Sequence, residues 1–245
     1  MVAHGNSAIN EWTIADSSFT ILDSANIPYL IAIGNHDYDD QANTRTATIY
    51  NSYFGQNRYM TKHWWSGGFY ENGAENSYCV LEVNNTKYLF MTLEYGARSG
   101  VIEWANEILT NNADKIAIIT THSYMYRDGT RTGAGDQYNP KNDLADANDG
   151  EDLWNNFIKL HNNIVWAQSG HDVTAGNGTS FRSDMSDGGK IVNQALANYQ
   201  DFPNAGDGYL RLVTFYPTTK TIKVQTYSPT LGEFLFGEND FSAMY

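Results

Sequence analysis

The chain has 245 residues, 41% hydrophobic content and a formal net charge of -13. No apolar run approaches the roughly 20 residues that span a bilayer, so we expect no membrane span. The negative charge argues against general nucleic-acid binding, which depends on Lys and Arg neutralising phosphates. Small phosphoester substrates stay open, because bound cations can supply local positive charge. We expect a single domain over residues 1–245.

The first half of the chain predicts alternating helices and strands. Apolar residues recur at helical spacing from Trp12 to Leu22, and a short apolar run then predicts a buried strand over residues 29–33. Residues 42–54 predict a helix. Residues 59–73 form an aromatic loop in which Trp64 and Trp65 are expected to pack against the core. The next expected elements are a hairpin of strands over residues 77–83 and 87–95, a helix over 101–108 and a strand over 115–121.

The second half begins with an unusual loop. Residues 126–150 are rich in Asp, Asn and Gly without periodicity, and we predict a lid-like loop because so long a connection is seldom idle. A helix over 153–160 and a strand over 163–168 follow. The remainder alternates like an antiparallel sheet, with a tight turn at residues 217–220. The order predicts an α/β fold with helices outside two packed sheets.

Three histidines each follow a predicted strand. They are His36, His122 and His171. Neutral imidazole is the commonest metal ligand, and side chains at neighbouring strand ends converge on one crevice. One histidine in this position is more often structural than a ligand. Three in the same setting favour a metal site.

The tripeptide Asn35-His36-Asp37 has a chemistry of its own. An amide oxygen can coordinate a hard divalent cation. A neighbouring histidine can protonate a leaving alkoxide if a carboxylate orients it. The alternative is a simple turn, because Gly and Asn favour turns.

Taken together, these motifs resemble those of the calcineurin-like metallophosphoesterases. The blocks are Gly34–Asp37, Thr121-His122 and Gly170-His171, in that order. The resemblance implies a four-layer α/β/β/α sandwich with a two-metal centre of Zn, Mn, Fe or Ni, acting on a small phosphomonoester or phosphodiester. It also implies the site residues, with Asn35, His122 and His171 as ligands of one metal, His36 as the general acid and Asp37 as its orienting carboxylate.

The chain departs from the family pattern in two places. The family opens with Asp-x-His or Asp-x-Gln and then Gly-Asp, and neither segment is in the sequence. We therefore expect an N-terminally incomplete member, whose secretion would depend on a signal peptide in the lost part. The family's closing Gly-His-x-His reads Gly170-His171-Asp172-Val173, so Asp172 is a possible substitute ligand.

Two other functions stay open. The chain could be a catalytically impaired or non-catalytic relative that binds at most one metal ion or a partner. A Ser-His hydrolase using Ser123 or Ser169 is the third alternative, although neither serine lies in a Gly-x-Ser-x-Gly elbow. The single cysteine, Cys79, is expected to be buried in a strand.

Overall fold

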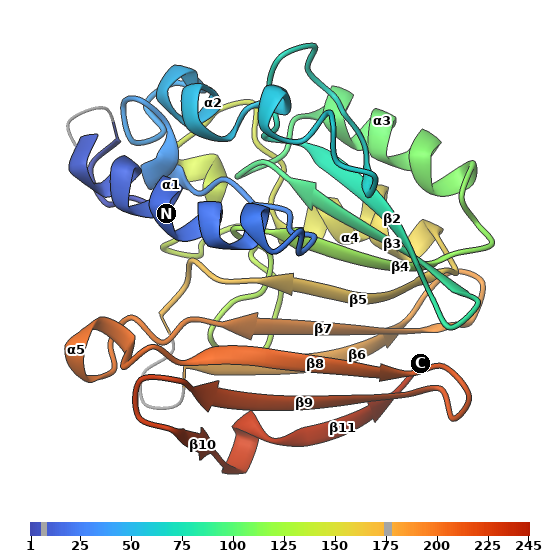
Figure 1. Cartoon of the computed structure of the whole chain (residues 1–245). Coiled ribbons are helices and arrows are strands. Elements are labelled where there is room, and N and C mark those ends of the chain that lie inside the picture. Colours follow the sequence, from blue (N-terminus) through green and yellow to red (C-terminus); the bar gives the residue numbers. More distant parts are fainter. Residues whose placement is uncertain (6–8, 174–177) are drawn as a thin grey trace.

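The computed structural model describes residues 1–5, 9–173 and 178–245, and it contains a mixed seven-stranded sheet and a smaller antiparallel sheet (Figure 1). The strands are β1 (Trp65–Gly68), β2 (Ser77–Val83), β3 (Thr86–Leu93), β4 (Ile116–Thr121), β5 (Ile164–Ser169), β6 (Thr179–Met185), β7 (Ile191–Ala197), β8 (Leu210–Tyr216), β9 (Thr221–Ser228), β10 (Glu233–Leu235) and β11 (Phe241–Met244). The α-helices are α1 (Ile9–Ser24), α2 (Thr48–Phe54), α3 (Ser99–Thr110), α4 (Gly150–Asn156) and α5 (Pro203–Gly206).

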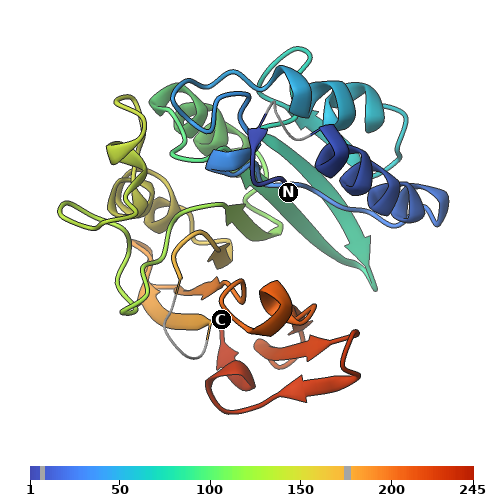
Figure 2. The same cartoon turned by 90° about the vertical axis from the view of Figure 1, so that its left-hand side faces the viewer.

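The large sheet places the carboxyl ends of four parallel strands side by side. Its order is β1-β2-β3-β4-β5-β7-β6, and the neighbours β3, β4, β5 and β7 run parallel. The predicted hairpin is confirmed: β2 and β3 pair antiparallel across Asn84 and Asn85, both with positive φ, as a two-residue hairpin turn requires. Figure 2 looks onto the end of the sheet at which β5 and β7 terminate.

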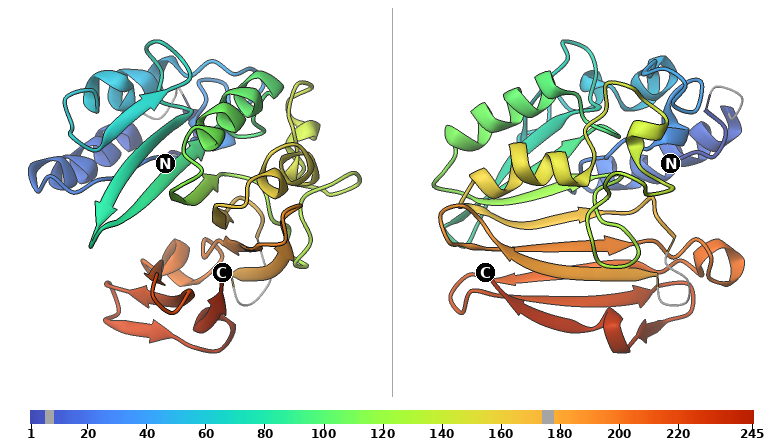
Figure 3. Two further views of the ribbon diagram at one scale, coloured as in Figure 1. Left: turned by 90° about the vertical axis from the view of Figure 1, so that its right-hand side faces the viewer. Right: turned by 180° about the vertical axis from the view of Figure 1, so that it is seen from behind.

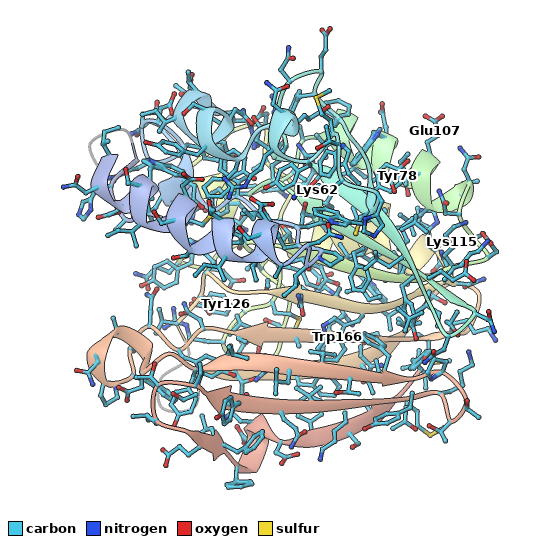
Figure 4. The ribbon with its side chains drawn as sticks, in the orientation of Figure 1. Lys62, Tyr78, Glu107, Lys115, Tyr126 and Trp166 are labelled. Carbon is cyan, nitrogen blue, oxygen red and sulfur yellow. The ribbon has the colours of Figure 1, made fainter. Side chains whose placement is uncertain are left out.

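The two faces of the large sheet are covered differently. Helices α3 and α4 pack on one face, through a core that includes Leu89, Ile119 and Phe157 (Figure 3, right). On the other face, α1 and α2 join an aromatic core with Cys79, while the small sheet packs through Trp166 and Ile222 (Figure 4). The expected burial of Cys79 is confirmed. No helix in the described ranges is both long and apolar enough to cross a bilayer.

Three predicted elements differ in the structure, the first being the loop expected over residues 59–73, which contains strand β1. Residues 29–33 belong to no strand, although Ile31 and Ile33 are buried as expected. Strand geometry needs a hydrogen-bonding neighbour, and apolar composition alone does not provide one. The predicted helix over 42–54 begins only at Thr48, because Gln41 and Ala42 have positive φ and form a turn.

The loop over residues 126–150 is anchored to the core. Asn139, Leu144 and Asp149 are buried within it. The Asp149 carboxylate accepts a hydrogen bond from Asp152 N at 3.0 Å and so caps α4. The expected loop is therefore present and partly anchored, and a role as a lid stays a prediction.

Glu75 is a buried carboxylate with one unpaired oxygen. Its Oε1 accepts a hydrogen bond from Asn51 Nδ2 at 2.8 Å, whereas Oε2 has no partner among the described residues. Burial raises the pKa of this carboxyl above its ordinary value of 4.5, because desolvation disfavours the charged form. The folded chain therefore holds this proton more tightly than the unfolded chain does.

A pH-dependent loss of stability follows from Glu75. Its stabilising contribution is complete below pH 4.5 and is lost as the pH rises through the raised pKa. Relative to Glu75→Gln, the wild-type free energy of unfolding should fall as the pH rises above about 4.5, by about 1.4 kcal/mol for each unit of raised pKa. Urea unfolding of both proteins at several pH values measures this. Parallel pH profiles for the two proteins would contradict it.

Candidate metal centre

His122 and Asn35 meet at the carboxyl end of the large sheet. His122 directly follows β4, and Asn35 begins the 3₁₀ turn Asn35–Asp37. The Nε2 atom of His122 lies 3.1 Å from Asn35 Oδ1. A Cβ atom at Gly34 would stand only 2.9 Å from the His122 ring, so glycine permits this close approach.

His171 completes a cluster of three donor atoms. It follows β5 and Gly170, and its Nδ1 lies 3.2 Å from His122 Nε2. At metal–ligand distances of about 2.1 Å, ligands 90° to 109° apart lie about 3.0 to 3.4 Å from each other. The two measured separations therefore suit neighbouring ligands of one ion. As hydrogen bonds the two contacts compete, because both use His122 Nε2, which can donate to Asn35 Oδ1 or accept from His171 Nδ1 but cannot do both.

The environment favours neutral imidazoles at the cluster. Burial, and then the neighbouring His171, hold the pKa of His122 well below its ordinary value of 6.5. Burial also lowers the pKa of His171. A neutral imidazole keeps a lone pair for coordination. Among the residues described, no group of three or more His, Cys, Asp or Glu side chains is arranged to hold a metal. The amide of Asn35 is thus needed to make a third ligand.

His36 and Asp37 lie beside the cluster but do not pair with each other. His36 is exposed, and its Nδ1 lies 3.0 Å from the carbonyl oxygen of Ala3. The buried Asp37 carboxylate accepts hydrogen bonds from Val2 N and Gly34 N, both at 2.9 Å, and from the amino group of Met1 at 2.7 Å. The predicted role of Asp37 in orienting His36 is therefore not the arrangement in the structure. These backbone N–H groups, and not His36, fix the orientation of the Asp37 carboxylate.

Asp172 is also occupied elsewhere. Its side chain is 1% exposed and forms an ion pair with Arg127, with Oδ1 2.5 Å from Nη2. Its Oδ2 accepts hydrogen bonds from Arg127 N at 2.6 Å and Nε at 3.1 Å. The structure thus turns both carboxylate oxygens of this possible substitute ligand toward Arg127. Val173, at the family's last ligand position, lines the pocket instead.

The cluster forms part of the wall of an open pocket of about 910 Å³. Its lining includes Asn35, His36, His122 and His171. Ser123 and Ser169 are buried, and the Ser169 hydroxyl accepts a hydrogen bond from Met125 N at 3.0 Å. Ser123 lines neither this pocket nor a smaller one of about 290 Å³, and Ser169 lines only the smaller one and is 7% exposed.

Three residues around the cluster were not identified from the sequence. The ring of Tyr95 lies 5.2 Å from that of His171, and the ring of Tyr138 lies 5.9 Å from it, edge to face. Asn198 Nδ2 donates to the carbonyl of His171 at 3.2 Å. Tyr95 and Asn198 both come shortly after parallel strands, so their position could have indicated them. Tyr138 belongs to the aperiodic loop, where no pattern indicates it.

Comparison with known proteins gives a relative but no family. No family model matches the chain. An uncharacterized protein of Bacillus subtilis (strain 168), YvnB, is 32% identical over 223 residues, which cover 90% of this chain. The chain spans 16% of the length of YvnB. The similarity therefore concerns a segment of a much longer protein.

Proposed function

We propose that the chain is a metal-dependent phosphoester hydrolase of the calcineurin-like type, acting on a small phosphomonoester or phosphodiester. The observation that carries this proposal is the convergence of Asn35 Oδ1, His122 Nε2 and His171 Nδ1 in an open pocket. The packing of a small sheet on the large one, with helices on the opposite face, supports the four-layer α/β/β/α arrangement as its finer description.

The residues present fit one divalent ion. Asn35, His122 and His171 would hold it, and a mixed N and O donor set suits Zn, Mn, Fe or Ni. When bound, such an ion polarises a phosphoryl oxygen and offsets its negative charge. The exposed His36 would give a proton to the leaving oxygen. Its Nδ1 faces the carbonyl of Ala3, which leaves Nε2 to exchange that proton.

A second candidate function is metal binding without catalysis. Three neutral side chains supply the donors described above, and Asp172 is committed to Arg127. Because Asp172 is paired with Arg127, the described residues of the pocket offer donors for one ion.

Calorimetric titration with Mn²⁺ or Zn²⁺, alongside hydrolysis of p-nitrophenyl phosphate and bis-p-nitrophenyl phosphate, tests both functions. We expect about one equivalent of metal to bind, and p-nitrophenol release to require it. Binding without hydrolysis would support the non-catalytic function. A folded chain that binds no metal would contradict both proposals.

A further inference from the structure

The backbone of His171 adopts a conformation that side chains disfavour. Its φ is +64°, in the left-handed region, where a Cβ crowds the following carbonyl. The turn around it is tight, since Asp172 N donates to the carbonyl of Gly170 at 2.8 Å. Such a residue keeps this conformation only where its surroundings enforce it.

An ion pair holds this turn from one side. Asp172, the residue after His171, places a buried carboxylate against the side chain and the backbone N–H of Arg127. The Arg127 guanidinium in turn lies 5.2 Å from the ring centre of Tyr126 and 5.0 Å from that of Tyr138. Tyr126 lies near the carboxyl ends of β5 and β7 (Figure 4). Arg127 thereby ties the turn to the long loop.

An amide holds the turn from the other side. Asn198, at the carboxyl end of β7, donates from Nδ2 to the carbonyls of His171 and Asp172, at 3.2 and 3.3 Å. These two weak bonds reach the backbone of the strained residue itself. Arg127 therefore holds the turn through the Asp172 side chain, and Asn198 holds it through two backbone carbonyl groups.

We propose that Arg127, Asp172 and Asn198 are positioning residues that hold His171 in its left-handed conformation, so that Nδ1 faces His122. The role in metal binding rests on the function proposed above. Asp172 thereby acts on the centre through the backbone of its neighbour. If this clamp is released, His171 relaxes toward negative φ and one of the three donors leaves the cluster.

The first test is metal affinity in Arg127→Met. We expect Mn²⁺ or Zn²⁺ affinity to fall about 10- to 100-fold, the usual loss when a group that orients a ligand is removed. Arg182→Met is the matched control, because Arg182 is similarly exposed and pairs with Asp184 on β6, away from His171. Its affinity should equal that of the wild type. Equal affinity in Arg127→Met and the wild type would overturn the proposal.

The second test needs no metal. Glycine adopts positive φ without steric cost and alanine adopts it only with one, so His171→Gly should melt about 2 to 8 °C above His171→Ala while the clamp is intact. The difference should largely vanish when both variants also carry Arg127→Met. An unchanged difference would show that Arg127 does not enforce the conformation. If the wild type binds no metal, the proposed function fails, and the melting temperatures still decide whether the clamp exists.

Discussion

Replacing His122 by alanine is expected to lower Mn²⁺ or Zn²⁺ affinity by more than about 100-fold and to abolish metal-dependent phosphoester hydrolysis. His122 Nε2 is the central atom of the cluster, 3.1 Å from Asn35 Oδ1 and 3.2 Å from His171 Nδ1. Its loss removes one of three donors, which should cost more than the 10- to 100-fold typical of losing a group that only orients a ligand. Calorimetry and p-nitrophenol release measure the two effects.

His161→Ala is the matched control for this experiment. His161 is also a partly buried histidine, but it lies at the amino end of β5 and bonds to Asn106 at 2.7 Å. Its replacement should leave both metal affinity and hydrolysis unchanged. Equal metal binding by His122→Ala and His161→Ala would place the ion elsewhere.

Replacing Arg131 by methionine is expected to destabilise the chain by about 2 to 4 kcal/mol. Arg131 is buried and its Nε donates to Gln194 Oε1 at 2.7 Å. Its Nη2 lies 2.5 Å from Asp184, and its guanidinium lies 3.9 Å from the ring centre of Trp154. The loss removes the charge-assisted bonds of a buried cation, but Asp184 keeps Arg182, Gln194 keeps Tyr124, and Asp184 is partly exposed, so we expect a loss below the largest values seen for buried pairs.

Urea unfolding followed by circular dichroism measures the effect. Arg182→Met serves as the control, because Arg182 pairs with the same Asp184 from a more exposed position and its loss should cost less than about 1 kcal/mol. The comparison holds the acceptor constant and changes the burial of the cation. Similar losses in the two variants would show that burial of Arg131 adds nothing.

The fold was predictable where local patterns decide the structure. Helix α1 and the β2–β3 hairpin follow from apolar spacing and from Asn84-Asn85, because both depend on near neighbours. Residues 29–33 have the composition of a strand but lack a strand neighbour among the described residues. Pairing depends on distant segments, so composition alone does not determine it.

The meeting of the three proposed ligands was predictable, but the partners of the two nearby carboxylates were not. Asn35, His122 and His171 each end a strand or an apolar run, and the carboxyl edge of the sheet brings them together. The partners of Asp37 and Asp172 are set by packing: backbone N–H groups for one, and Arg127, 45 positions away, for the other. Nothing in the adjacent sequence indicates either partner.

The separation of the three donors along the chain would link the proposed metal binding to folding. Asn35 and His122 are 87 positions apart, and His122 and His171 are 49 apart, so the unfolded chain has no such site. An ion bound only by the folded chain stabilises it by about 2.7 kcal/mol at 100 times its dissociation constant. Melting temperatures measured with different metal ions would therefore identify the preferred ion without knowledge of the substrate. His122→Ala is the control, because its melting temperature should not respond to the ion.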